Sequence, residues 1–206
     1  MSDQDLEVSR RDLLRVIGAS LTLSGGGLEV LSAQDAAHVH HMAGEARAKG
    51  DYHPKCFTAH EYATLRRLAE MIVPPEEHSK GALEAGAPEF IDLLASSNAE
   101  LAAIYTGGMA WLDEQMKHRY QAAFTDAAPA QQTAMLDLIA YRKNEAAHPE
   151  LAPGIRFFTW VRNMVVDAYY SSEAGRQDLG FMGNGALATF TVPEESLQYV
   201  LKRSPV

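Results

Sequence analysis

Residues 58–75 read Thr-Ala-His-Glu-Tyr-Ala-Thr-Leu-Arg-Arg-Leu-Ala-Glu-Met-Ile-Val-Pro-Pro and hold the clearest helix signal in the chain. Thr58 and Glu61 have the spacing of a capping box, in which the threonine hydroxyl accepts an early backbone N–H and the glutamate reaches back. Proline lacks the N–H that a continuing helix needs, so Pro74-Pro75 ends the run. Between these signals, apolar residues recur at helical spacing: Tyr62, Leu65, Leu68, Ala69 and Ile72.

Further helices are predicted downstream. Pro88, Pro129 and Pro153 suit a first helical turn, and each precedes apolar residues at helical spacing. The expected helices cover 88–95, 99–120, 129 to about 148, 153 to about 169, and a short last segment from 193 to 201. No strand-like alternation of useful length appears. The predicted fold class is therefore all-α, a single irregular helical bundle of about five to six helices after an N-terminal signal segment.

Four residues within these helices carry specific expectations. Gly107-Gly108 lies in the middle of 99–120, where each glycine costs roughly 1 kcal/mol, so we expect a kink or a close packing contact there. Asp92 and Asp167 are embedded among apolar residues, which makes them candidates for buried capping or for contacts with a partner.

The N-terminus has the layout of a twin-arginine export signal. A polar leader reaches Arg10-Arg11, and a short, mildly apolar run from Leu13 to Leu23 follows. That run is about half of the roughly 20 residues that a spanning helix needs, so it is interpreted as an export address rather than an anchor. The alternative is the first turn of an ordinary amphipathic helix with two surface arginines. The signal is assigned to residues 1–33.

The remaining chain divides into a linker and a folded body. Residues 34–54 are polar and rich in Ala, His and Gly, and they are predicted to form a flexible linker. The linker contains His38, His40 and His41, which make only a weak metal site because they stand in a stretch that is predicted to be flexible. Residues 55–206 are predicted to form the helical domain.

Charge and cysteine content exclude several classes of function. The net charge of −9 with only 18 Lys and Arg argues against nucleic-acid binding, which needs a basic face. The single cysteine, Cys56, cannot form an internal disulfide or a multi-cysteine metal site. In an exported chain it is either a buried inert thiol or a thiol bonded to another subunit.

Motifs for catalysis are scarce. No Gly-x-Gly-x-x-Gly or Cys-x-x-Cys-His occurs, and the serines lack a Gly-x-Ser-x-Gly turn. Glu145-x-x-His148 has di-iron spacing, but it has no second copy. Cys56 beside His53 or His60 is a weak candidate nucleophile. We therefore expect no catalytic, cofactor or metal residue in this chain and place the cofactor in a partner.

Two regions are candidates for contact with a partner. The stretch 175–185 holds four glycines and is predicted to be a loop whose backbone approaches another surface closely. Aromatic residues gather at Phe157-Phe158-Thr159-Trp160 and at Tyr169-Tyr170, where core packing and an exposed docking patch are both open.

Several blocks of the sequence resemble the gluconate 2-dehydrogenase subunit 3 family. They are 57–65, 71–74, 81–82 with 86–92, and Tyr170 followed by Gly175, Asp178-Leu179-Gly180 and Gly183-Asn184, spanning about residues 52–203. The blocks stand in the family's order, and the twin-arginine leader is typical of it.

The resemblance implies a small, non-catalytic subunit that escorts and stabilises a large catalytic subunit. It implies a glucose–methanol–choline type oxidoreductase partner that carries FAD, a cytochrome c partner that carries haem, and a periplasmic location reached through the twin-arginine translocase. The candidate partner-binding residues are Phe57, Asp178, Leu179, Gly180, Phe181, Gly183 and Asn184, with Cys56 as a candidate intersubunit thiol. Two alternatives stay open: an autonomous periplasmic metal-binding protein or oxidoreductase, and a purely stabilising subunit.

Overall fold

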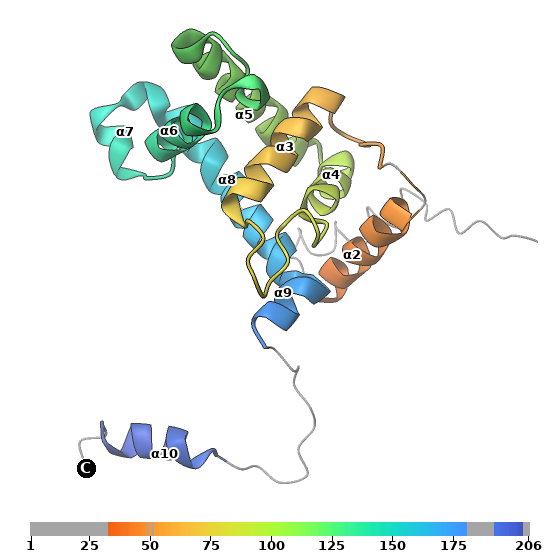
Figure 1. Ribbon diagram of the computed structural model, residues 1–206, viewed down its shortest axis with the longest axis vertical. Helices are drawn as coiled ribbons and strands as arrows, with labels where there is room; N and C mark the ends of the chain where they lie inside the picture. The colour runs from red at the N-terminus through yellow and green to blue at the C-terminus, as the bar shows by residue number, and fades with distance from the viewer. Residues whose placement is uncertain (1–32, 49, 51, 181–191, 204–206) are drawn as a thin grey trace, which may run out of the picture.

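The helix predicted from the capping box is present as α3, Ala59–Ile72. Thr58 Oγ1 accepts from the Glu61 backbone N at 3.2 Å, and Glu61 Oε2 accepts from the Thr58 backbone N at 2.8 Å. The helix ends before Pro74, with Val73 as its C-cap. The computed structural model describes residues 33–48, 50, 52–180 and 192–203, and Figure 1 shows their arrangement.

The other helices are α2, Ala33–Ala48; α4, Ala87–Ser97; α5, Ala99–Tyr120; α6, Pro129–Ile139; α7, Lys143–Ala147; α8, Ala152–Ser171; α9, Glu173–Asp178; and α10, Glu194–Leu201. Two short 3₁₀ turns cover Phe124–Asp126 and Pro149–Leu151. The described ranges contain no strand, so the all-α prediction is confirmed. The expected fourth helix is divided into α6 and α7, and α2 and α9 are additional.

Helix α8 is the centre of the bundle. It contacts α2, α3, α4, α5, α6 and α9, and Figure 1 shows it running behind α3 from α6 towards α9. Its inward side chains are buried, among them Ile155, Phe158, Val161 and Val165. The core therefore forms around one long helix, and most other elements are positioned by it.

Helices α5 and α8 pack closely at two places, and at each place an aromatic ring of one helix lies against a glycine of the other. A Cβ built at Gly108 of α5 would lie 2.0 Å from the Phe157 ring of α8. A Cβ built at Gly154 of α8 would likewise lie 2.0 Å from the Trp111 ring of α5. The close packing contact expected at Gly107-Gly108 is thus present at Gly108, while Gly107 faces open space.

The prediction of a flexible linker at 34–54 is wrong for residues 34–48, which form most of α2. Ala36, Val39 and Ala43 recur on one face of α2 and are buried, and α2 packs on α4 and α8. The helix was missed because its buried face uses mainly alanines, so its apolar pattern is weak in the sequence. Alanine is the best helix former, which favours a helix here without a strong stripe.

The predicted loop at 175–185 is wrong at its start, because Glu173–Asp178 form α9. The Ser172 hydroxyl caps this helix by accepting from the Gly175 backbone N at 3.1 Å. A Cβ at Gly175 would lie 2.2 Å from the Tyr169 carbonyl oxygen, so glycine here allows α9 to fold back onto α8. The glycine serves a close backbone contact within the chain.

Among the described residues, none of the helices combines the length and the apolar character that crossing a membrane requires.

Candidate functional site

Asp92 of α4 holds the segment that leads into α3. Its Oδ2 accepts from the Tyr52 hydroxyl and from the Lys55 backbone N, both at 2.7 Å. Its Oδ1 accepts from the backbone N of Cys56 at 3.0 Å and of Phe57 at 3.2 Å. Asp92 is 0% exposed, so four donors compensate a fully buried carboxylate. The prediction of a buried capping role is confirmed for Asp92, whereas the side chain of Asp167 is exposed.

The Asp92 contacts fix the positions of Cys56 and Phe57. Phe57 is 5% exposed and packs in the core, with its ring centroid 5.8 Å from that of Tyr105. The prediction that Phe57 contacts a partner is therefore corrected, because the ring offers almost no surface. Cys56 is free and half-buried. Burial, with the nearby carboxylates of Asp92 and Glu61, raises the pKa of its thiol, which disfavours the nucleophilic thiolate.

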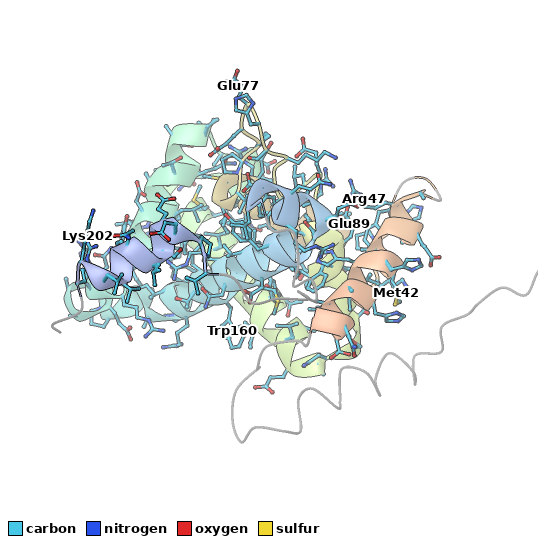
Figure 2. All side chains as sticks on the ribbon, turned by 90° about the horizontal axis from the view of Figure 1, so that it is seen from below. Met42, Arg47, Glu77, Glu89, Trp160 and Lys202 are labelled. Atoms are coloured by element: carbon cyan, nitrogen blue, oxygen red, sulfur yellow. The ribbon has the colours of Figure 1, made fainter. Side chains whose placement is uncertain are left out.

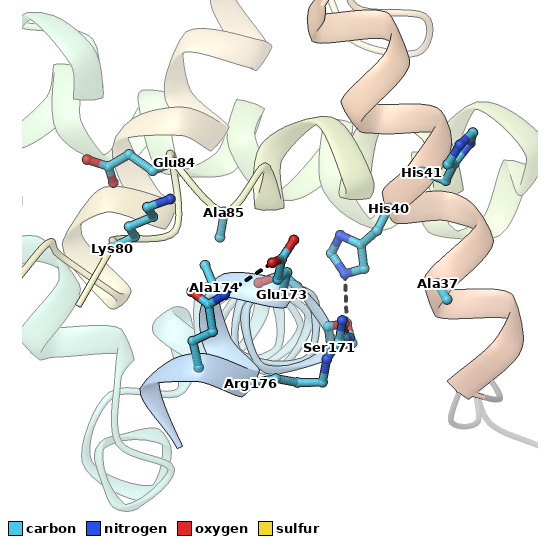
Figure 3. Close-up of a pocket in the computed structure, with 12 residues that line it drawn as sticks. Ala37, His40, His41, Lys80, Glu84, Ala85, Ser171, Glu173, Ala174 and Arg176 are labelled. Carbon is cyan, nitrogen blue, oxygen red and sulfur yellow. Dashed lines mark hydrogen bonds between the residues drawn. The ribbon is translucent and has the colours of Figure 1, made fainter. Parts of the chain in front are cut away.

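A pocket of about 460 Å³ lies between α2, α9 and the segment before α4. Figure 3 shows His40 of α2 pointing across it towards Ser171 at the end of α8. Its Lys, Arg and Glu lining residues come from two parts of the chain: Lys80 and Glu84 from the segment before α4, and Glu173 and Arg176 from α9. The lining is mainly polar and balanced in charge, which suits a polar contact surface better than an apolar ligand.

Hydrogen bonds define the state of His40. The Ser171 hydroxyl donates to the Asp167 carbonyl oxygen at 2.5 Å, so its oxygen accepts from His40 Nε2 at 2.9 Å. The imidazole ring also lies against Phe90, with centroids 4.5 Å apart. Burial, and then the charge of Arg176, lowers the pKa of His40 to about 4. His40 is therefore neutral at pH 7 and donates a structural hydrogen bond.

Arg176 closes the same pocket from α9. Its Nη1 donates to the Ser171 backbone oxygen at 2.6 Å, which satisfies a carbonyl in the last turn of α8. A cation at this end of a helix is also favoured by the helix dipole. The groups around Ser171 are thus engaged in joining α2, α8 and α9.

A second, more open pocket of about 370 Å³ includes Arg47, Arg66 and Glu89. Figure 2 shows Arg47 of α2 next to Glu89 of α4. Glu89 is 2% exposed, and its Oε1 lies 3.8 Å from Arg47 Nε and 3.7 Å from Arg66 Nη1. Two arginines from different helices therefore compensate this buried charge, and Arg47 adds a hydrogen bond to the Glu84 carbonyl oxygen at 3.1 Å.

The predicted glycine-rich contact region is described only in part. Asp178, Leu179 and Gly180 lie at the end of α9 and are exposed, with Leu179 62% exposed. Phe181, Gly183 and Asn184, like Arg10 and Arg11 of the export signal, lie outside the described residues. The exposed end of α9 adjoins the His40 pocket, since Arg176 and Gln177 line that pocket.

The aromatic stretch of α8 is mostly core. Phe157, Phe158 and Tyr169 are buried, while Tyr170 is 39% exposed. Core packing therefore accounts for most of this aromatic density.

Side chains of the kind that bind metals do not gather in the described ranges. Within residues 33–180 (except 49 and 51) and 192–203, no group of three or more His, Cys, Asp or Glu side chains could hold a metal ion. Glu145 and His148 are both exposed, and His148 Nδ1 lies 3.2 Å from Glu150.

Sequence reasoning missed the pocket residues His40, Ser171 and Arg176. The i, i+3, i+7 spacing of Ala36, Val39 and Ala43 would have identified α2 as a packed helix and placed His40 beside its buried face. No comparable signal links Ser171 to His40, since the contact joins residues 131 positions apart.

Together these features define a small all-helical protein whose buried polar groups join its helices. The chain belongs to the gluconate 2-dehydrogenase subunit 3 family, whose model matches residues 59–186. The match runs from the start of α3 to beyond α9, so α2 and α10 lie outside it. No curated protein and no solved structure matches the chain.

Proposed function

We propose that this chain is the non-catalytic small subunit of a periplasmic, flavin-dependent sugar dehydrogenase complex, which it supplies with an export signal. Membership of the gluconate 2-dehydrogenase subunit 3 family, which makes it a dehydrogenase subunit, is the observation that carries the proposal. The Arg10-Arg11 signal supports the export role, because the twin-arginine route carries proteins that have already folded and can hold a cofactor.

The redox chemistry belongs to other chains in this proposal. FAD resides in a large glucose–methanol–choline type subunit, and haem resides in a cytochrome c subunit. The state of the reactive side chains supports this division: His40 is neutral and bonded to Ser171, and burial raises the pKa of Cys56. The small subunit contributes a shaped helical surface that stabilises the catalytic subunit during and after export.

The test replaces Arg10 and Arg11 with lysine and measures the dehydrogenase activity in the periplasm. We expect the flavoprotein to remain in the cytoplasm and the periplasmic activity to fall at least about tenfold, because the pair forms the export address. The matched control replaces Arg119 and Arg162, both exposed on the helical body, with lysine. Normal periplasmic activity of the Arg10→Lys, Arg11→Lys variant would contradict the escort role.

A second measurement addresses the catalytic assignment. The purified mature chain, free of its partners, is expected to show no flavin absorbance and no stoichiometric metal. A bound flavin or metal at one equivalent per chain would instead support the autonomous metal-binding protein or oxidoreductase.

A further inference from the structure

Helix α10, Glu194–Leu201, carries an apolar face that no described residue covers. Leu197, Val200 and Leu201 follow i, i+3, i+4 spacing and so lie on one side of the helix. They are 42%, 59% and 57% exposed, and no residue of α10 is buried. Figure 1 shows α10 lying away from the other labelled helices.

Exposed apolar side chains are concentrated in this segment. Five of the eight large hydrophobic residues that are exposed in the described ranges fall within 192–201, and the other three are Tyr141, Tyr170 and Leu179. Helix α10 is as amphipathic as α3 and α4, which bury their apolar faces in the core. A concentrated patch on an amphipathic helix marks an interaction surface, whereas scattered single residues do not.

The remaining side chains of α10 are arranged to support a helix. Gln198 donates to Glu194 across one turn at 2.8 Å, and the Arg203 guanidinium lies 3.9 Å from the Tyr199 ring centroid. Glu194 and Glu195 stand at the positive end of the helix dipole, and Lys202 and Arg203 follow its negative end. Eight residues are nevertheless too few for a stable helix alone in water, so packing of the apolar face has to supply the rest.

Three occupants compete for the apolar face. A second copy of α10 is disfavoured, because three aliphatic side chains on each helix bury roughly 600 Å² in total, about half of what a stable interface needs. A membrane surface is disfavoured because the polar side carries Glu194, Glu195, Ser196 and Gln198, whereas interfacial helices carry lysine and arginine there. Docking of α10 on another subunit of the dehydrogenase complex requires no basic face. It also requires no large buried area from α10 alone, because other surfaces of the chain can contribute to the same interface.

We propose that α10 docks through Leu197, Val200 and Leu201 into an apolar groove on the large catalytic subunit. This inference rests on the proposed function and adds the docking element to it. The contact is of the helix-in-groove type, in which residues at i, i+3 and i+4 serve as anchors. Helix α10 lies outside the family match at 59–186, so it adds to whatever surface the matched region provides.

The test compares the affinity of the mature chain and of its Leu197→Gln, Leu201→Gln variant for the purified catalytic flavoprotein. Burial of one leucine side chain changes a binding constant by about 10- to 100-fold, so we expect at least a tenfold loss of affinity. Since neither residue belongs to the buried core, the thermal midpoint of the isolated variant should equal that of the wild type.

Two control variants accompany this test. Gln198→Ala alters the polar side of α10, and Tyr141→Gln removes a side chain that is 56% exposed on the body. Both variants are expected to bind the flavoprotein with an affinity within about twofold of the wild type. This change is well below the loss expected when one anchor residue is removed.

The outcomes separate the docking from the proposed function. Wild-type affinity of the Leu197→Gln, Leu201→Gln variant overturns the docking alone. The docking is also overturned if the isolated wild-type chain forms a dimer and the variant does not. It is overturned as well if the wild-type chain binds phosphatidylglycerol vesicles and the variant does not. A wild-type chain with no affinity for the flavoprotein overturns the proposed function as well.

Discussion

Gly108 of α5 and Phe157 of α8 are in contact so close that a Cβ added at Gly108 would lie 2.0 Å from Cδ2 of the ring. Phe157 is 3% exposed, and its ring also meets that of Tyr105 edge to face at 6.3 Å. The neighbouring Gly107 is exposed, and a Cβ there would meet nothing within 4 Å. Two adjacent glycines of one helix therefore have opposite packing constraints.

The first prediction concerns this glycine pair. Gly108→Ala should lower the free energy of unfolding by about 1–3 kcal/mol, because the new methyl group overpacks the core against Phe157. Gly107→Ala should raise it by about 0.5–1 kcal/mol, because alanine favours the helix and has free space. Urea unfolding of both variants provides the measurement. Equal effects of the two substitutions would refute the packing argument.

The second prediction concerns the carboxylate of Asp92. In Asp92→Asn one acceptor oxygen becomes a donor NH₂ group, which faces donors on the segment 52–57. The loss of charge-assisted hydrogen bonds should lower the free energy of unfolding by about 2–3 kcal/mol. Urea unfolding is the measurement, and Asp126→Asn at an exposed position is the control. A variant within about 0.5 kcal/mol of the wild type would show that the four hydrogen bonds contribute little.

The third prediction concerns pH and His40. In the folded chain the pKa of His40 is about 4, below its ordinary value of 6.5, because burial and Arg176 disfavour the charged imidazole. The unfolded state therefore binds more protons between these two pH values. Stability contributed by neutral His40 is complete above about pH 6.5 and is lost as the pH falls towards 4.

Thermal unfolding between pH 7.5 and 4 measures this dependence in the wild type and in His40→Gln. The part of the acid destabilisation that His40 causes should be absent from the variant. His78→Gln, at an exposed position, should keep the wild-type profile. Superimposable profiles of the wild type and His40→Gln would exclude His40 as the source.

The fourth prediction concerns Cys56. Its thiol is half-buried with a raised pKa, so iodoacetamide should react with it more slowly in the folded chain than in urea at the same pH. Asp92→Asn should accelerate the reaction, because it loosens the segment that holds Cys56.

A non-reducing gel tests whether Cys56 is bonded to another subunit. Cys56→Ser should leave the mobility of the complex on this gel unchanged, and a Cys56-dependent band would instead reveal an intersubunit disulfide.

Strong local signals made much of the fold predictable. The Thr58–Glu61 capping box and Pro74 gave both ends of α3, and the range 99–120 predicted for α5 agrees with the structure. Caps and prolines act within one turn of the chain, so they can be found from neighbouring residues. Asp92 was also identifiable, because a carboxylate among apolar residues of one helix needs donors when it is buried.

Features that depend on distant residues were not predictable. The spacing of Ala36, Val39 and Ala43 gives α2 a weak helical signal, but nothing within 34–48 shows that α4 and α8 pack on that face. Gly175 suggested a loop, yet its function is a tight contact with the carbonyl of Tyr169. The pocket at His40 could not be predicted because α2 supplies one of its walls and α9 another, and the sequence predicted a linker and a loop in place of these two helices.

The paired contacts of Phe157 with Gly108 and of Trp111 with Gly154 also limit how the body responds to assembly. Because each ring lies where a Cβ of the other helix would otherwise stand, we expect α5 and α8 to move as one rigid unit. Helices α2 and α9 lie outside this unit and both contact the end of α8, through His40 with the Ser171 hydroxyl and through Arg176 with the Ser171 carbonyl oxygen. We therefore expect any adjustment to a partner to be confined to the periphery, with the dimensions of the core unchanged between the free and the assembled subunit.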